Sequence, residues 1–310
     1  KIGKSSLLNY IHMPQNRQQY LDHPDRMVMV FLDFQQERSM SMDTFVRTLV
    51  GMAGIELQDR LDLSNCGSGL EGVRSLVDRL NSAGYRIAVL MDGFEAVTRN
   101  PNFDLEFFSF LRFLANHFNV AYLTSSTRAL QILCHTQEIA DSPFFNIFST
   151  MRLGLFEPEE AFELISAPSQ RIGRPLAPYA DALLETAGRF PFFLQMLCSH
   201  AVEYMEQYPD RQPDLREICR RFEDEAIDEY NHIWDGLDED ERRSIVCMAE
   251  GRKLPESREY VIPELRRKSY VEEVGGEPRL FSASFRRYAL SKAGEYRQGF
   301  FRRFFGRSSS

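Results

Sequence analysis

The sequence lacks the features that mark membrane-spanning, disulfide-bonded and zinc-binding proteins. No run approaches the roughly 18 apolar residues that a membrane-spanning helix needs, and no signal peptide is visible in the residues present. The five cysteines are scattered and form no C-x-x-C pair. This spacing favours reduced thiols in the cytoplasm over disulfides or zinc. The six histidines show no ligand spacing with one another or with the cysteines, so a histidine metal site is unsupported.

Strong positive charge is also absent. The chain of 310 residues carries a formal net charge of −8, so it is not a general binder of polyanions, and any contact with nucleic acid requires a local basic patch. Its 43% hydrophobic and 26% charged residues are typical of a soluble globular protein. The length suffices for two or three domains, each with its own core.

The chain opens on Lys1-Ile2-Gly3-Lys4-Ser5-Ser6, and Gly3, Lys4 and Ser5 match the end of the phosphate-loop pattern G-x-x-x-x-G-K-[ST]. In that pattern the glycine lets the backbone approach phosphate oxygens, the lysine supplies a charge between the β- and γ-phosphates, and the serine offers a hydroxyl to Mg²⁺. Gly3, Lys4, Ser5 and Ser6 are therefore predicted to bind ATP or ADP. So short a match also arises by chance. The first glycine and its strand would lie before residue 1, so we expect the sequence to be cut there.

The first half of the chain alternates strand and helix signals. Continuous apolar runs predict buried strands at residues 27–32, 87–91 and 120–124, and amphipathic segments predict helices between them. This alternation indicates a parallel α/β sheet over residues 1–155. The phenylalanines of the helix predicted at 105–118 are interpreted as core residues.

Strand signals stop near residue 157. Residues 156–236 read as a helical subdomain, and residues 237–291 show two helices, a hairpin turning at Gly275-Gly276 and a last helix ending at Leu290. That order of elements is typical of a winged helix. Residues 292–310 form a basic, aromatic tail or linker, which could bind an anionic membrane surface, dock onto a partner or begin another module.

Polar residues follow two of the predicted strands. The strand at 86–92 ends in Asp92, as in a Walker B segment, where the carboxylate would meet the Mg²⁺ held by Ser5. After the next strand, Thr124 could sense the γ-phosphate or orient the attacking water, and Arg128 could neutralise phosphate charge. The alternatives are an ordinary capped strand end and a polar turn.

Together these segments resemble the STAND NTPases, which are related to AAA+ ATPases, and in particular their archaeal-ATPase-like branch. The resemblance spans residues 1 to about 290. Thr186-Ala-Gly188-Arg-Phe-Pro191-Phe-Phe-Leu-Gln195 is similar to the T-G-G-x-P-x-x-L-Q motif of that family. The resemblance implies that Gly188 and Pro191 belong to a helical lid that touches the nucleotide, and that a winged helix follows the lid.

Two departures from the family pattern bear on catalysis. The family commonly places an acid directly after the Walker B aspartate, where this chain has Gly93. Glu95 could supply the missing general base or lie on a solvated turn, so ATP binding is better supported than hydrolysis. The lid motif retains one of its two glycines, Gly188. Asp33, at the end of an earlier strand, is either a second acid near Mg²⁺ or a strand terminator.

The resemblance implies a nucleotide-controlled switch that oligomerises and controls an effector module outside this chain, with a signalling or defence role by analogy. One alternative is an AAA+ ATPase of the origin-recognition or transposition type that binds DNA through Arg266, Arg267 and Lys268. These residues could equally form a basic face packed against the acidic segment 223–225. A second alternative is a nucleotide-bound scaffold that does not hydrolyse ATP.

Overall fold

The structure, a computed structural model, describes residues 2–34, 40–58 and 60–305, with side chains up to Gly294. The chain forms two compact units, which are described separately. The sheet unit comprises Gly3–Arg152, and the helical unit comprises Leu153–Ser310 together with Lys1–Ile2.

Three parallel strands form the centre of the sheet unit. They are β1 (Met27–Asp33), β2 (Arg86–Asp92) and β3 (Val120–Thr124), in the spatial order β1-β2-β3. The three apolar runs therefore form the strands predicted from the sequence, and the α/β prediction is confirmed. Because the strands are parallel, their carboxyl ends meet at one edge of the sheet.

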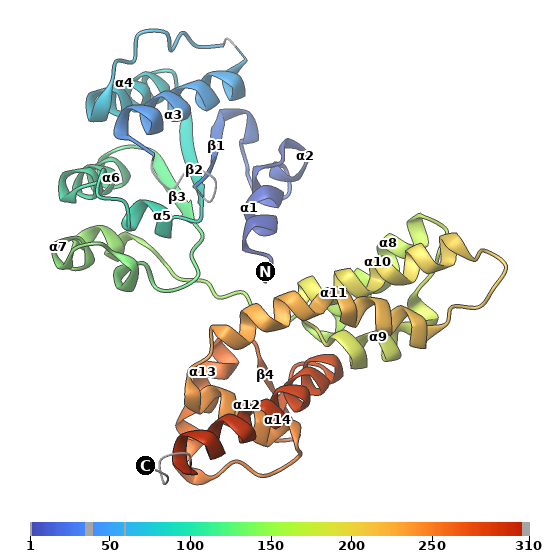
Figure 1. Cartoon of the computed structure of the whole chain (residues 1–310). Helices are drawn as coiled ribbons and strands as arrows, with labels where there is room; N and C mark the ends of the chain where they lie inside the picture. The colour runs from blue at the N-terminus through green and yellow to red at the C-terminus, as the bar shows by residue number, and fades with distance from the viewer. Residues whose placement is uncertain (1, 35–39, 59, 306–310) are drawn as a thin grey trace. The chain divides into compact units, whose positions relative to one another are not determined.

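Helices cover both faces of this sheet (Figure 1). On one face, α1 (Lys4–His12) packs Leu8 against residues of β1 and β2, with the short α2 (Pro14–Arg17) beside it. The other face is covered by α3 (Met42–Leu57), α4 (Gly69–Ser82) and α6 (Leu105–His117). Two further short helices, α5 (Glu95–Thr98) and α7 (Gln137–Ala140), belong to the same unit. The helix α1 is thus held against the sheet by Leu8.

Phenylalanine side chains fill the larger of the two cores around the sheet. Phe107 and Phe108 of α6 are fully buried and pack against Phe103 and Phe144, as the interpretation of that helix as a core element predicts. Phe113 on the same helix is instead 36% exposed, so it is not a core residue.

The helical unit begins with four helices: α8 (Pro158–Arg171), α9 (Ala180–Ala187), α10 (Pro191–Gln207) and α11 (Leu215–Asp235). It continues through α12 (Glu239–Ala249), α13 (Ile262–Arg267), the antiparallel pair β4 (Val271–Val274) and β5 (Glu277–Leu280), and α14 (Ala283–Phe305). The predicted hairpin is present, and Gly275 and Gly276 both adopt the positive φ that its tight turn requires. The segments predicted as lid and winged helix share one hydrophobic core.

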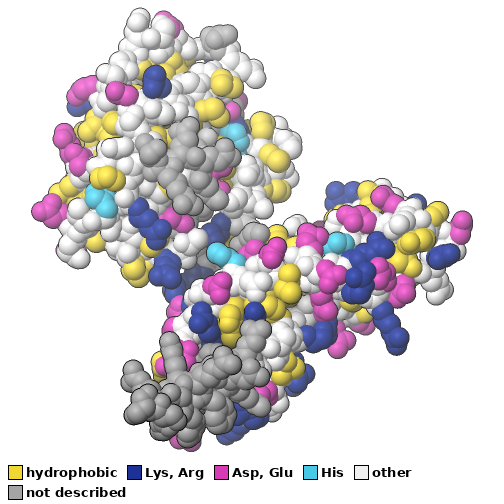
Figure 2. Space-filling view, in the orientation of Figure 1, with side chains coloured by type: hydrophobic (Ala, Val, Ile, Leu, Met, Phe, Trp, Pro, Cys, Tyr) yellow, Lys and Arg dark blue, Asp and Glu magenta, His cyan; other side chains and the backbone are white. Residues whose placement is uncertain are grey.

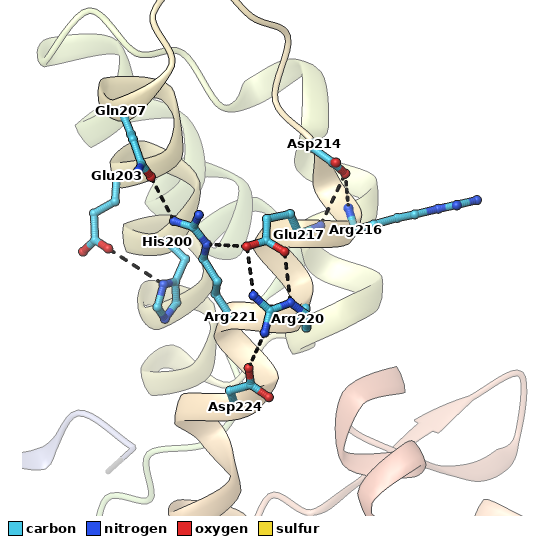
Figure 3. Close-up of polar contacts among 9 residues, drawn as sticks. All are labelled: His200, Glu203, Gln207, Asp214, Arg216, Glu217, Arg220, Arg221 and Asp224. Carbon is cyan, nitrogen blue, oxygen red and sulfur yellow. Dashed lines mark hydrogen bonds and ion pairs between the residues drawn. The ribbon is translucent and has the colours of Figure 1, made fainter.

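A network of charged side chains lies at the start of α11 (Figure 3). Asp214 caps the helix, and Glu217 accepts hydrogen bonds from Arg220 and Arg221. These bonds lower the pKa of the Glu217 carboxyl to about 2. Arg220 also bonds Asp224 one turn further on, at 2.8 Å. The network lies at the surface and joins residues three or four apart, so it supports the helix rather than forming a site.

The last helix is longer than the sequence predicts. We expected it to end at Leu290, but the backbone of α14 remains helical to Phe305. The side chains of the basic, aromatic tail lie outside the described residues, so its membrane or partner role stays a prediction. Among the helices that the structure describes, none is both long and apolar enough to cross a bilayer.

The described surface carries side chains of both charges (Figure 2). Lysine and arginine side chains lie among aspartate and glutamate side chains over much of the helical unit in this view. Such mixing fits the negative net charge and the many ion pairs of this unit. It gives no support to general binding of polyanions.

Candidate functional site

The first turn of α1 presents backbone amides. Gly3 precedes the helix with φ 98° and ψ 9°, a left-handed conformation that glycine adopts without strain. The first intrahelical bond runs from the Leu7 N–H to the Gly3 carbonyl at 2.9 Å. The amides of Lys4, Ser5 and Ser6 precede this first bond, so they have no partner within the helix itself, and such a helix end favours an anion.

Acidic residues end two adjacent strands. Asp33 and Asp92 are register partners at the ends of β1 and β2, and Thr124, at the end of β3, is the register partner of Met91. Asp92 is only 3% exposed. Figure 1 shows α1 beginning at the end of the sheet where α5 follows β2. The predicted site residues of the sheet unit thus come from segments that begin or end at this edge.

Ser125 connects the loops that follow β2 and β3, and the sequence did not single it out. Its hydroxyl donates to Asp92 Oδ1 and accepts the Gly93 N–H at 3.0 Å. The Phe94 N–H donates to the Ser125 carbonyl at 2.9 Å. Residues 124–127 at the end of β3 all carry hydroxyl groups, which marks the segment as polar. The sequence pattern does not say which of these four side chains points into the protein.

Glu95, the predicted general base, begins α5. Its Oε1 accepts the Thr127 N–H at 3.3 Å, whereas Oε2 is buried and has no hydrogen-bond partner among the described residues. Leaving a buried carboxylate oxygen unpaired is costly, so a water, cation or substrate group is expected to pair with it. Arg128 is exposed, and its carbonyl accepts a bond from Ser126 Oγ at 2.6 Å.

The conformation of Gly93 explains why no acid follows Asp92 directly. Its φ is +69°, in the left-handed region, and its N–H is held by Ser125. A glutamate or aspartate there would cost about 1–2 kcal/mol of backbone strain. Glycine therefore suits this turn, and the nearest glutamate is Glu95.

The donor atoms of this region suit Mg²⁺. Asp92 supplies a carboxylate and Ser5 a hydroxyl, both hard oxygen donors. Within the described part of the chain, no three histidine, cysteine or acidic side chains gather into a metal site. Mg²⁺ commonly binds one or two protein oxygens and completes its coordination with phosphates and water.

Gly188 and Pro191 lie in the helical unit, where the structure gives each a structural role. Gly188 has φ +68°, and a Cβ atom there would lie 1.8 Å from the Phe281 carbonyl oxygen. Pro191 is buried at the first position of α10, where its missing N–H costs nothing. Their contact with nucleotide stays a prediction.

The three cations of the predicted DNA contact are all engaged in ion pairs. Arg266 contacts Glu273 at 2.7 Å, Arg267 donates to Glu264 at 2.7 Å, and Lys268 pairs with the buried Glu241. The suggested packing of these residues against the acidic segment 223–225 is wrong. Residues of that segment pair instead with Arg287, Arg220 and His200.

Comparison with known proteins identifies the family. The family model described as Novel STAND NTPase 2 matches residues 1–254. No curated protein sequence matches the chain.

Solved structures show the same fold at low sequence identity. A Walker-type ATPase of Pyrococcus abyssi is 14% identical with a TM-score of 0.63, covering 93% of this chain and 88% of that chain. The ORC2 protein of Aeropyrum pernix, solved in ADPNP and ADP complexes, is 12% identical with a TM-score of 0.62. The match covers 97% of this chain and 85% of the ORC2 chain. These similarities confirm the predicted class of P-loop ATPase fold with a parallel sheet and accompanying helices. The winged helix stays a prediction.

Proposed function

The chain belongs to the novel STAND NTPase 2 family, and on this basis we propose that it binds and hydrolyses ATP as a nucleotide-controlled switch. The observation that carries the proposal is the combination of Gly3-Lys4-Ser5 at the start of α1 with a buried aspartate, Asp92, ending a strand on which α1 packs. A phosphate group needs free amides and a cation, and Mg²⁺ needs oxygen donors.

Each site residue has a proposed role. Gly3 and the amides of the first turn of α1 surround the phosphates, and Lys4 contributes its charge between them. Ser5 and Asp92 would hold Mg²⁺, which neutralises charge on the phosphates when bound. Ser6 contributes its backbone amide, since its side chain is exposed.

Hydrolysis would depend on groups that follow β2 and β3. Glu95 acts as the general base, and its unpaired Oε2 is the atom that would accept the proton of the attacking water. Thr124 orients that water or senses the γ-phosphate, and the exposed Arg128 neutralises phosphate charge. If the protein binds ATP without hydrolysing it, it is instead a nucleotide-bound scaffold.

The switch itself is proposed from the family. Gly188 and Pro191 touch the nucleotide from the helical lid, ATP and ADP select different arrangements, and oligomers of the protein control an effector in a signalling or defence response. DNA binding receives less support, because Arg266, Arg267 and Lys268 would each have to leave a glutamate to meet a phosphate.

Titration calorimetry of the full-length protein with ATP and ADP, with and without Mg²⁺, tests this proposal. We expect binding of both nucleotides and tighter ATP binding in Mg²⁺. Single-turnover hydrolysis then separates the switch from the scaffold. If neither ATP nor ADP binds, with or without Mg²⁺, the proposal is contradicted.

A further inference from the structure

The hydroxyl of Ser125 is buried between the carboxylate of Asp92 and the turn that follows it. Ser125 is 7% exposed and Asp92 3% exposed, so both polar groups depend on protein partners. The Gly93 N–H donates to Ser125 Oγ at 3.0 Å, and Ser125 Oγ contacts Asp92 Oδ1. Three polar groups from two loops thus satisfy one another.

These contacts define where the hydroxyl proton lies. A backbone N–H can only donate, so Ser125 Oγ is the acceptor in its bond with Gly93. A carboxylate oxygen can only accept when ionised, so the Ser125 proton points at Asp92 Oδ1. The Gly93 N–H, the Ser125 hydroxyl and the Asp92 carboxylate thus form a chain of two hydrogen bonds that run in the same direction. Hydrogen bonds to charged acceptors are among the stronger ones in proteins.

Backbone bonds keep the serine in place. Its N–H donates to the Met91 carbonyl at 2.9 Å, and its own carbonyl accepts the Phe94 N–H at 2.9 Å. Residues before and after Asp92 are therefore bound to the same serine that bonds its side chain. Rotation of the carboxylate would have to break a buried bond, which this arrangement disfavours.

We propose that Ser125 is a positioning residue that holds the Asp92 carboxylate in the orientation needed for Mg²⁺, an inference that rests on the proposed function. The serine occupies one acceptor position of Oδ1, so it limits how the carboxylate can turn towards a cation. Groups that orient a metal-binding carboxylate in this way affect metal affinity although they never touch the ion.

The neighbouring hydroxyl residue offers a control. Ser126 Oγ donates to the Arg128 carbonyl at 2.6 Å and is not bonded to Asp92. Ser126→Ala therefore removes a hydroxyl from the same loop without touching the carboxylate. Ser125→Thr keeps a hydroxyl at the position of interest and tests whether that group, rather than the size of the side chain, is required.

The experiment measures ATP affinity of the full-length protein with and without Mg²⁺ by calorimetry, together with the melting temperature. For Ser125→Ala we expect the Mg²⁺-dependent gain in affinity to fall by about tenfold to a hundredfold. Affinity without Mg²⁺ should stay close to the parent value. Ser125→Thr should restore most of the gain, and Ser126→Ala should behave as the parent.

The outcomes separate the two claims. An unchanged Mg²⁺-dependent gain in a folded Ser125→Ala variant overturns the positioning role while leaving the proposed function intact. A lower melting temperature with the full gain also overturns it, because the serine then serves folding only. If the parent protein does not bind ATP, the proposed function is refuted, and so is the positioning role that rests on it.

Discussion

At the residue scale, the turn between β2 and α5 combines a left-handed backbone position with a buried carboxylate oxygen that is unpaired among the described residues. The left-handed residue is Gly93, and the oxygen is Oε2 of Glu95. Glycine adopts this conformation without strain, whereas an unpaired buried acceptor costs about 1–3 kcal/mol of stability. Costs of this kind are typical of functional positions, where they are offset by packing elsewhere.

Replacing Glu95 by glutamine should separate binding from chemistry. The amide cannot accept a proton from water, so we expect Glu95→Gln to bind ATP as the parent does and to hydrolyse it about a hundredfold or more slowly in single-turnover assays. Glu71→Gln, at an exposed glutamate in the first turn of α4, is the matched control and should keep the parent rate. Hydrolysis by Glu95→Gln at the parent rate would place the base elsewhere.

Replacing Gly93 by alanine should cost stability because its backbone is left-handed. With φ at +69°, a side chain at this position adds about 1–2 kcal/mol of strain, and thermal unfolding should occur at a lower temperature. Gly54→Ala is the control, because that glycine lies inside α3 with no atom within 4 Å of an added Cβ. It should leave the protein equally or slightly more stable. Equal effects of the two changes would argue against the left-handed turn.

At the element scale, the loop between α9 and α10 packs against the β4–β5 hairpin of the helical unit and the residue that follows it. Arg189 Nη2 contacts Glu272 of β4 at 2.6 Å, and the Phe190 ring lies 5.4 Å from that of Phe281. Gly188 packs against the backbone of Phe281. The segment that resembles the lid motif is therefore also a packing junction, whatever it does with nucleotide.

This junction predicts a large effect of Gly188→Ala. The added Cβ would lie 1.8 Å from a backbone oxygen, which cannot move as a side chain can. Gly173→Ala isolates the cost of the backbone, since Gly173 has φ +69° and no atom within 4 Å of its Cβ position. We expect chemical denaturation to show a loss of about 1–2 kcal/mol for Gly173→Ala and a clearly larger loss for Gly188→Ala. Similar losses would contradict the close packing.

The elements also show how much of the fold and site a sequence can predict. Continuous apolar runs identified β1, β2 and β3, because strands buried on both faces require them. Gly275-Gly276 identified the hairpin, because its turn requires positive φ. A local sequence pattern does not reveal tertiary contacts. It therefore could not predict that Ser125 points inward or that Arg266 and Lys268 pair with glutamates.

At the scale of the whole molecule, the chain builds separate hydrophobic cores around the sheet and in the helical unit. The family match extends over both units, and the structural likeness to the Pyrococcus abyssi ATPase covers 93% of the chain. The phosphate-binding residues and Asp92 belong to the sheet unit. The claim that ATP controls the molecule therefore depends first on that unit.

Calorimetric titration of full-length Lys4→Ala with ATP and Mg²⁺ tests this central claim most directly. In the phosphate-loop pattern this lysine supplies the charge between the β- and γ-phosphates, so we expect ATP affinity to fall by about tenfold to a hundredfold or more. Lys253→Ala, at an exposed lysine of the helical unit, should bind ATP as the parent does. A Lys4→Ala variant that binds ATP with the affinity of the parent would contradict the assignment of this site.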